Sequence, residues 1–391
     1  MTRLAERLQA SSEAYRHRIL LVVTGLSPQV VTETIYALAL RRDPPFVPTE
    51  VQLLTTAEGA ERARLSLLSE DPGWFGRLCR DYGLEGIRFD AACIRVLQGR
   101  DGGGLTDIRT PEDNERAADQ TTETVRALTA DPESALHVSI AGGRKTMGFF
   151  VGYALSLFGR PQDRLSHVLV EAPFESHPDF FYPPPRPRVV YTPPPDSRPL
   201  DASQARVSLA EVPFVQLRDG LPTRLLEGRA SFTQTVEAAQ RALAPPELIL
   251  DPSLPGVVAA GEPIRLRPAE LAFYRWLADR RRQGRHAVRW DDPHLADEYL
   301  AYYREAVGEM SGDYERAEAA LARGMEMDWF QQRKARTNGA LAKALGTHLA
   351  QPYLIVGSGN RPHMRFGLAL DPDNIRDRGI AGPGRTAPGR R

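Results

Sequence analysis

Short apolar runs and amphipathic segments alternate along the chain up to residue 170. The runs are rich in leucine and β-branched residues, which is typical of buried strands, and the segments repeat their apolar residues at helical spacing. The predicted strands are 18–23, 51–55, 94–97, 136–140 and 166–170, and the predicted helices are 30–39, 60–68, 74–82, 111–129 and 145–158. Such alternation predicts an α/β fold, with a parallel sheet covered by helices on both faces.

The pattern changes after residue 171. Prolines crowd residues 172–199, and no core helix tolerates that density. This stretch is either a linker or an extended excursion within the first domain. We favour the excursion because residues 207–217 have the pattern of one more strand pair, which extends the first domain to about residue 225.

The C-terminal part of the chain has a mostly helical pattern. Helices are predicted over 268–282, 297–307, 313–323 and 328–345, followed by a strand over 353–356, a turn at 357–360 and a strand over 364–368. The order helix, strand, turn, strand is the ending of a winged helix-turn-helix. We therefore expect an α/β domain over 17–225, a helical linker over 226–262, a winged-helix-like domain over 263–375 and a disordered tail over 376–391.

Composition narrows the class of protein. The 391 residues suit two domains, and the formal net charge is zero because 50 basic side chains balance 50 acidic ones. No chain-wide positive field therefore attracts nucleic acid, so any anion site must be local. The two cysteines form no CxxC pair, which argues against a structural zinc site. The apolar run at 18–23 is far shorter than the roughly 20 residues that span a bilayer, so we expect a cytoplasmic protein without membrane contact, metal or cofactor.

Two turns follow predicted strands and begin predicted helices, which is where open parallel sheets bind ligands. The first is TGLSPQ at residues 24–29. Its free backbone N–H groups favour an anion at the helix start, Gly25 permits close approach of the backbone, and Ser27 supplies a hydroxyl. The alternative is an ordinary turn in which Ser27 caps the helix.

The second turn is AGGRKT at residues 141–146. Arg144 and Lys145 place two cations at a helix start, where they oppose the helix dipole unless an anion lies between them. A phosphate loop, GxxxxGK[ST], is excluded because Arg144 stands where its second glycine is needed. The dinucleotide fingerprint GxGxxG is excluded because TGLSPQVV has one glycine where three are needed. An exposed turn without a ligand is the alternative.

These two motifs resemble those of the CARF proteins of type III CRISPR systems, and more narrowly those of the ring nucleases. The segment LTDIRTPEDNERAAD at 105–119, the proline-rich stretch and VSLAEVPFVQL at 207–217 add to the resemblance. It implies a Rossmann-like CARF domain that binds cyclic tetra-adenylate across a homodimer axis. It also implies that the protein cuts this ring to linear di-adenylate and thereby ends the antiviral signal. A ring with approximate two-fold symmetry suits a dimer that presents each turn twice.

The resemblance also implies roles for individual residues. The family's cleavage residues match Ser27 and Lys145; we expect Lys145 to neutralise growing negative charge and Ser27 to orient the ribose or the scissile phosphate. Attack of a ribose 2′-hydroxyl on the adjacent phosphorus would leave a 2′,3′-cyclic phosphate without help from a metal. No histidine lies in either motif, so turnover should be slow.

Ten further residues are expected to bind the ligand. Eight belong to the two turns and two to the glycine-rich segment 99–110, which is either a lid over the ligand or a plain loop. They are Thr24, Gly25, Leu26, Gln29, Gly142, Gly143, Arg144 and Thr146 from the turns, and Asp107 and Arg109 from the segment.

Two other functions stay open. Arg281 and His286 fit the R-x4-6-H spacing of the RNase domains that many CARF relatives carry, although arginine is so dense there that some spacing had to fit. A ligand-gated regulator would instead read DNA through its last long helix and its wing. The residues concerned are Gln331, Gln332, Arg333, Lys334, Arg336, Arg361, His363 and Arg365. The same domain could equally serve only dimer contacts or frame the ligand.

Overall fold

The computed structural model describes residues 15–228, 230–360 and 363–379. The chain divides into two compact units. Unit 1 comprises residues 1–218 and 226–235, and unit 2 comprises residues 219–225 and 236–391. Each unit has its own hydrophobic core. The chain therefore passes between the units more than once around residue 225.

Unit 1 contains a six-stranded sheet in the order β3-β2-β1-β4-β5-β8. The first five of these strands in the chain run parallel, and β8 is antiparallel to β5. The bounds are β1 (His17–Val23), β2 (Glu50–Thr55), β3 (Ile94–Val96), β4 (Ser134–Ser139), β5 (Arg164–Val170) and β8 (Val207–Glu211). The predicted α/β class with a Rossmann-like parallel sheet is confirmed.

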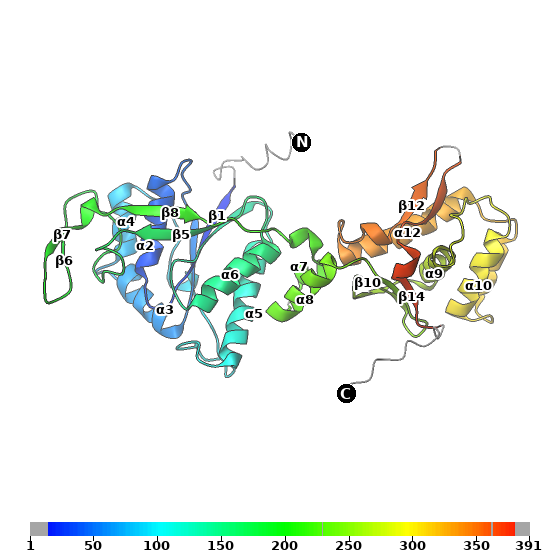
Figure 1. Ribbon diagram of the computed structural model, residues 1–391, viewed down its shortest axis with the longest axis horizontal. Helices are drawn as coiled ribbons and strands as arrows, with labels where there is room; N and C mark the ends of the chain where they lie inside the picture. The colour runs from blue at the N-terminus through cyan, green and yellow to red at the C-terminus, as the bar shows by residue number, and fades with distance from the viewer. Residues whose placement is uncertain (1–14, 229, 361–362, 380–391) are drawn as a thin grey trace, which may run out of the picture. The chain divides into compact units, whose positions relative to one another are not determined.

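Helices cover both faces of this sheet (Figure 1). On one face lie α2 (Gln29–Tyr36), α3 (Ala57–Ala63) and α4 (Trp74–Tyr82), and on the other lie α5 (Pro111–Leu128) and α6 (Lys145–Phe158). Residues 20–23 of β1 are all fully buried. This is why β1 is a continuous apolar run rather than an alternating one.

The strand order reverses between β1 and β4. The chain leaves β1 for α2 on one face and leaves β4 for α6 on the other, because right-handed crossovers in opposite directions place their helices on opposite faces. The two turns predicted as sites therefore lie side by side at the carboxyl ends of adjacent strands. Such a switch point is where open α/β sheets bind ligands.

One predicted strand pair is wrong in its second half. Residues 207–211 form β8, but residues 212–217 form no strand. Pro213 has no backbone N–H to donate to a ladder, which ends the strand two residues earlier.

The proline-rich residues 172–199 belong to unit 1. Phe174, Phe180, Phe181 and Tyr182 are buried in its core. An antiparallel hairpin of β6 (Val189–Tyr191) and β7 (Pro199–Asp201) follows them. The stretch is therefore held to the core by aromatic side chains before it forms the hairpin.

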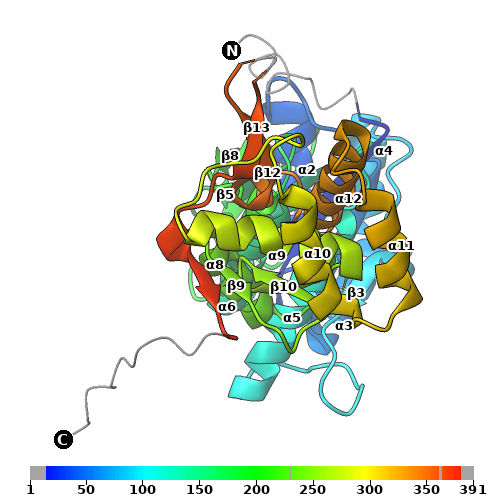
Figure 2. The same ribbon diagram turned by 90° about the vertical axis from the view of Figure 1, so that its right-hand side faces the viewer.

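Unit 2 combines a four-stranded sheet with a cluster of helices. The sheet has the order β11-β10-β9-β14 and contains β9 (Leu248–Leu250), β10 (Gly256–Ala259), β11 (Glu262–Arg265) and β14 (Ile375–Asp377). The helices are α9 (Pro268–Arg282), α10 (Leu295–Val307), α11 (Gly312–Leu321) and α12 (Met327–Leu345) (Figure 2). They enclose large buried aromatic side chains, among them Tyr274, Trp276 and Phe330.

A hairpin follows α12, as the winged-helix pattern requires. It consists of β12 (Ile355–Ser358) and β13 (Arg365–Leu368). The side-chain amide of Asn338 in α12 bonds both the N–H and the carbonyl of Ile355 at 2.9 Å. The order helix, strand, turn, strand is thus present, and the identification as a winged helix stays a prediction.

The expected helical linker over 226–262 differs from the structure. The helices α7 (Thr223–Glu227) and α8 (Phe232–Leu243) occupy its first part, but β9 and β10 occupy residues 248–259. Ala260 and Gly261 have φ of 53° and 72°, which suits the tight turn between β10 and β11. Strand β14 includes the first two residues of the expected disordered tail over 376–391, and residues 380–391 lie outside the described ranges.

Candidate functional site

The two turns touch each other through their glycines. A Cβ on Gly25 would lie 3.2 Å from the Cα of Gly143, and one on Gly143 would lie 3.1 Å from the backbone nitrogen of Gly25. A Cβ on Gly142 would overlap the hydroxyl of Thr24. Gly143 also has a φ of +86°, which side chains disfavour. The close approach of the two backbones therefore depends on glycine at all three positions.

Both helices that leave these turns begin without a side-chain cap. Pro28 is the N-cap of α2 and Arg144 is the N-cap of α6, and neither helix start donates a hydrogen bond to a capping side chain. Ser27 therefore does not cap α2, contrary to the alternative that the sequence left open. In α2 the N–H groups of Val30 and Val31 already donate to the carbonyls of Ser27 and Pro28, and in α6 Met147 donates to the carbonyl of Arg144. Among the described residues, the N–H groups of Gln29, Lys145 and Thr146 have no acceptor and can bind an anion.

A cavity of about 420 Å³ opens beside the two turns. Four chain segments contribute to it, each of which follows the carboxyl end of a parallel strand. Its lining residues are Gly25, Leu26 and Ser27, then Thr56 and Glu58, then Thr106, Asp107 and Arg109, and finally Gly143, Arg144 and Met147. Hydroxyl groups, two guanidinium groups and two carboxylates thus face one space.

Asp107 holds the arginines of this cavity. Arg144 donates two hydrogen bonds to its carboxylate, one from Nε at 2.9 Å, and Arg109 donates a third at 3.4 Å. The hydrogen bond from Arg144 holds the pKa of Asp107 well below its ordinary value. The positive charge of Arg144 at the start of α6 therefore already has a protein carboxylate beside it, and it does not by itself require a bound anion.

Five of the predicted site residues do not line the cavity. Lys145 and Thr146 are exposed at the start of α6. Thr24 is buried and donates its hydroxyl to the Ser27 carbonyl at 3.1 Å, so it shapes the first turn. Gly142 packs against Thr24. The side-chain carbonyl of Gln29 is buried and accepts no hydrogen bond from the described residues.

The segment 99–110 is tied to its surroundings by backbone hydrogen bonds. Leu105 donates its N–H to Leu97 and accepts one from Ala57, both at 2.7 Å. Thr110 then caps α5 in a capping box with Asp113. The segment forms one wall of the cavity, and its movement as a lid stays a prediction.

Sequence reasoning missed four lining residues, namely Thr56, Glu58, Thr106 and Met147. A signal for the first two exists: β2 is parallel to β1, so the residues that follow it must lie at the same edge of the sheet. Met147 lies one helical turn into α6 and packs below Gly143, where a Cβ on Gly143 would meet its sulfur at 3.3 Å. That contact has no signal in the sequence.

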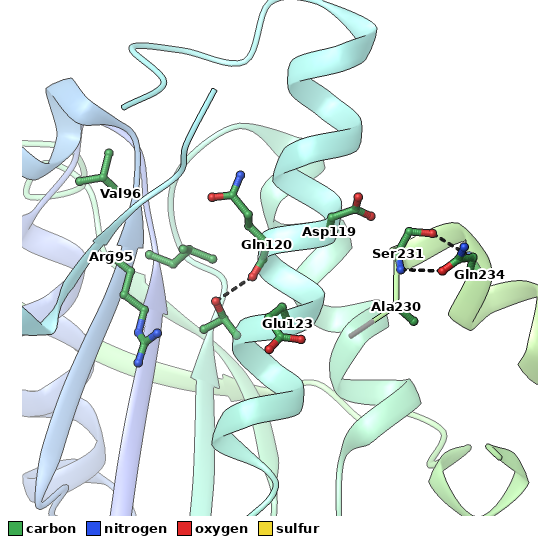
Figure 3. A pocket seen from close by; sticks show the side chains of 10 residues that line it. Arg95, Val96, Asp119, Gln120, Glu123, Ala230, Ser231 and Gln234 are labelled. Carbon is green, nitrogen blue, oxygen red and sulfur yellow. Dashed lines mark hydrogen bonds between the residues drawn. The ribbon is translucent and has the colours of Figure 1, made fainter. Parts of the chain in front are cut away.

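A second cavity of about 500 Å³ lies between α5 and the strands β2 and β3 (Figure 3). Its charged groups are already bonded within unit 1. Arg95 donates to Gln52 at 2.8 Å, Glu123 pairs with Arg126, and Asp119 accepts the N–H of Phe232 at 2.7 Å. None of the predicted site residues lines this cavity.

The residues of the two alternative functions have internal partners in unit 2. Arg281 donates its Nε to the carbonyl of Leu370 at 2.8 Å, which is a structural contact. Arg333 pairs with Glu270 at 2.9 Å, and Arg365 binds the carboxylate of Asp292 through two nitrogens. Lys334 lies over the ring of Phe366. Arg361 lies outside the described residues. Several of the expected DNA contacts are thus engaged within the unit.

The described part of the chain has neither a cluster of metal ligands nor a membrane-spanning helix. No group of three or more His, Cys, Asp or Glu side chains there gathers in a way that could hold a metal ion. No helix there combines the length and the apolar character needed to cross a membrane.

The fold and the cavity define an α/β protein of the doubly wound, Rossmann-like class, with a charged pocket at its switch point. Residues 27–245 match the family described as CRISPR-associated protein NE0113. This match spans more than half of the 391 residues, and the chain belongs to that family. It therefore has a role in CRISPR systems. A search of curated proteins returned no match.

Proposed function

We propose that this protein binds cyclic tetra-adenylate across a homodimer axis and cleaves it to linear di-adenylate with 2′,3′-cyclic phosphate ends. Cleavage would switch off type III CRISPR signalling. Membership of a CRISPR-associated family supports a role in CRISPR systems. The observation that carries the proposal is the contact between the two turns, which brings Ser27, Gly143 and Arg144 to one cavity beside the start of α6.

The proposed reaction is an internal transesterification. The ribose 2′-oxygen attacks the adjacent phosphorus, the bond from phosphorus to the 5′-oxygen breaks, and a proton passes from the 2′-hydroxyl to solvent while the 5′-oxygen gains one. Arg144 and the amides of the glycine turn would hold the phosphate, and Ser27 would orient the ribose or the scissile phosphate. Lys145, at the start of the same helix, would neutralise the charge that develops on phosphorus. No histidine is among the residues that line the cavity, so the reaction should be slow.

The size of the cavity supports a dimer. A volume of about 420 Å³ lies near the lower end of the roughly 300–1,000 Å³ that holds one drug-sized ligand. A ring of four nucleotides is several times larger than such a ligand. One chain therefore offers room for a fraction of the ring, and two copies related by a two-fold axis would complete the site.

Exposed apolar groups beside the turns also support a second copy. The Leu26 side chain is 46% exposed, and Phe149, one turn along α6 from Lys145, is 58% exposed. Phe149 lies 5.7 Å from Tyr153 on the same helix, measured between ring centroids. Clustered exposed apolar side chains mark interaction surfaces more often than isolated ones do.

The test is incubation with labelled cyclic tetra-adenylate in EDTA and separation of the products. We expect di-adenylate with cyclic phosphate ends. Lys145→Ala should lower the cleavage rate by roughly 100-fold or more, and Ser27→Ala should lower it less and weaken binding. Intact ring after long incubation would refute cleavage, and wild-type rates in both variants would refute these residue roles.

A further inference from the structure

Glu58 is a second acidic residue in the cavity lining, besides Asp107, that the proposed chemistry does not use, and its charge opposes phosphate binding. It lines the same cavity of about 420 Å³ as Arg109 and Arg144. A negative charge in a phosphate-binding site weakens binding unless it faces a part of the ligand that donates hydrogen bonds. The position of Glu58 therefore indicates that an uncharged, hydrogen-bond-donating part of the ligand lies beside it.

The backbone around Glu58 is held firmly against the first turn. Thr56 caps α3 by accepting the N–H of Gly59 at 3.3 Å. The hydroxyl of Thr55 donates to the carbonyl of Gly25 at 3.3 Å, and a Cβ on Gly59 would overlap that carbonyl. The start of α3 and the Ser27 turn are thus in direct backbone contact. This contact fixes the position of the Glu58 backbone relative to the first turn.

The carboxylate of Glu58 has one free oxygen. Its Oε1 accepts a hydrogen bond from Arg62 at 3.0 Å, and both side chains are about half exposed. An exposed pair at this spacing on a helix is weak. No donor among the described residues bonds Oε2. A ligand that brings an N–H group into the cavity would therefore find an acceptor there.

We infer that Glu58 reads the exocyclic amino group of one adenine, so that the cavity accepts an adenylate unit and rejects bases with a carbonyl oxygen there. This inference rests on the proposed function and deepens it. On the N7 edge of the base, adenine presents an amino donor, whereas hypoxanthine and guanine present only oxygen and nitrogen acceptors, which a carboxylate repels. The apolar side chain of Leu26 lines the same cavity, is 46% exposed and can contact the face of the base.

The experiment compares two rings of equal size and charge, cyclic tetra-adenylate and cyclic tetra-inosinate, by titration calorimetry. The wild-type protein should bind the adenylate ring at least about tenfold more tightly, since a hydrogen bond to a charged group is worth one or two factors of ten. In Glu58→Gln the preference should fall severalfold, because the amide can also donate to the inosine oxygen. Glu58→Ala, which has neither a donor nor an acceptor in its side chain, should abolish the preference. Glu61→Gln, an exposed change on the same helix and away from the cavity lining, should keep it.

The outcomes separate the inference from the proposed function. Equal affinity of the wild-type protein for both rings would overturn the role of Glu58 and leave the ring nuclease proposal standing. A preference that survives in both Glu58 variants would also overturn it, because another group would then read the amino group. No binding of either ring would refute the proposed function itself.

Discussion

Glu33 in α2 is a buried carboxyl group that should make the stability of unit 1 depend on pH. Its side chain is 7% exposed, and its carboxyl accepts no hydrogen bond from the described residues. Burial, and to a smaller degree the charge of Glu175, raises the pKa of Glu33 from 4.5 to about 8. The folded protein therefore holds this proton at neutral pH, while the unfolded chain releases it.

The sign of the effect follows from proton binding. Between pH 4.5 and about 8 the folded state binds more protons at Glu33 than the unfolded state does, so stability falls as the pH rises through this window and is level above it. At about 1.4 kcal/mol for each pH unit, the full loss is on the order of 4–5 kcal/mol. Glu33→Gln cannot ionise and should lack this loss.

Hydrogen exchange of peptides from β1 and β4 measures the effect within unit 1. After correction for intrinsic exchange, the difference in opening free energy between pH 5 and pH 9 should be several kcal/mol smaller in Glu33→Gln than in the wild-type protein. Glu61→Gln, an exposed change on α3, is the matched control and should behave like the wild-type protein. Equal pH dependence in Glu33→Gln and wild-type protein would refute the reasoning.

Three further predictions concern the site and its surroundings. Gly142→Ala adds a Cβ that overlaps the Thr24 hydroxyl. It should destabilise unit 1 by about 1–3 kcal/mol in thermal unfolding and weaken ring binding. The control Gly76→Ala, whose Cβ would meet only the end of the Arg80 side chain, should be nearly neutral. Asp107→Asn removes the charge beside Arg144 and should raise the affinity for cyclic tetra-adenylate a few-fold at low salt, with the gain shrinking at high salt; lower affinity would mean that the carboxylate positions the arginine. Phe149→Glu should shift the protein toward monomer in analytical ultracentrifugation and slow ring cleavage, and an unchanged dimer would exclude this face of α6 from the interface.

The parallel sheet was predictable because burial on both faces leaves a strong sequence pattern. The runs at 18–23 and 136–140 correspond to β1 and β4, and the predicted bounds of α4, α6 and α9 match the structure. The strands β9 and β10 were missed because three or four residues are too few to show a period, and their pairing depends on contacts across a turn. Strand β14 pairs with β9 from more than 120 residues away, which no local pattern indicates.

The site was predictable to the extent that it follows from strand order. A turn after β1 and a turn after β4 must be neighbours once these strands pair, and Ser27 and Arg144 do line one cavity. The partner of Arg144 was not predictable in the same way, because Asp107 lies 37 residues earlier and reaches it through a loop. Lys145 follows Arg144 directly, yet the start of the helix turns its side chain to solvent rather than into the cavity lining.

On this proposal the two touching turns bind a cyclic oligoadenylate. Hydrogen exchange of the protein with and without cyclic tetra-adenylate tests it most directly, because peptides covering residues 24–29, 56–59 and 141–146 report on the cavity. The account predicts that the ring slows exchange in these peptides and leaves peptides from residues 119–124, at the second cavity, unchanged. Protection confined to the second cavity, or none at all, would contradict it.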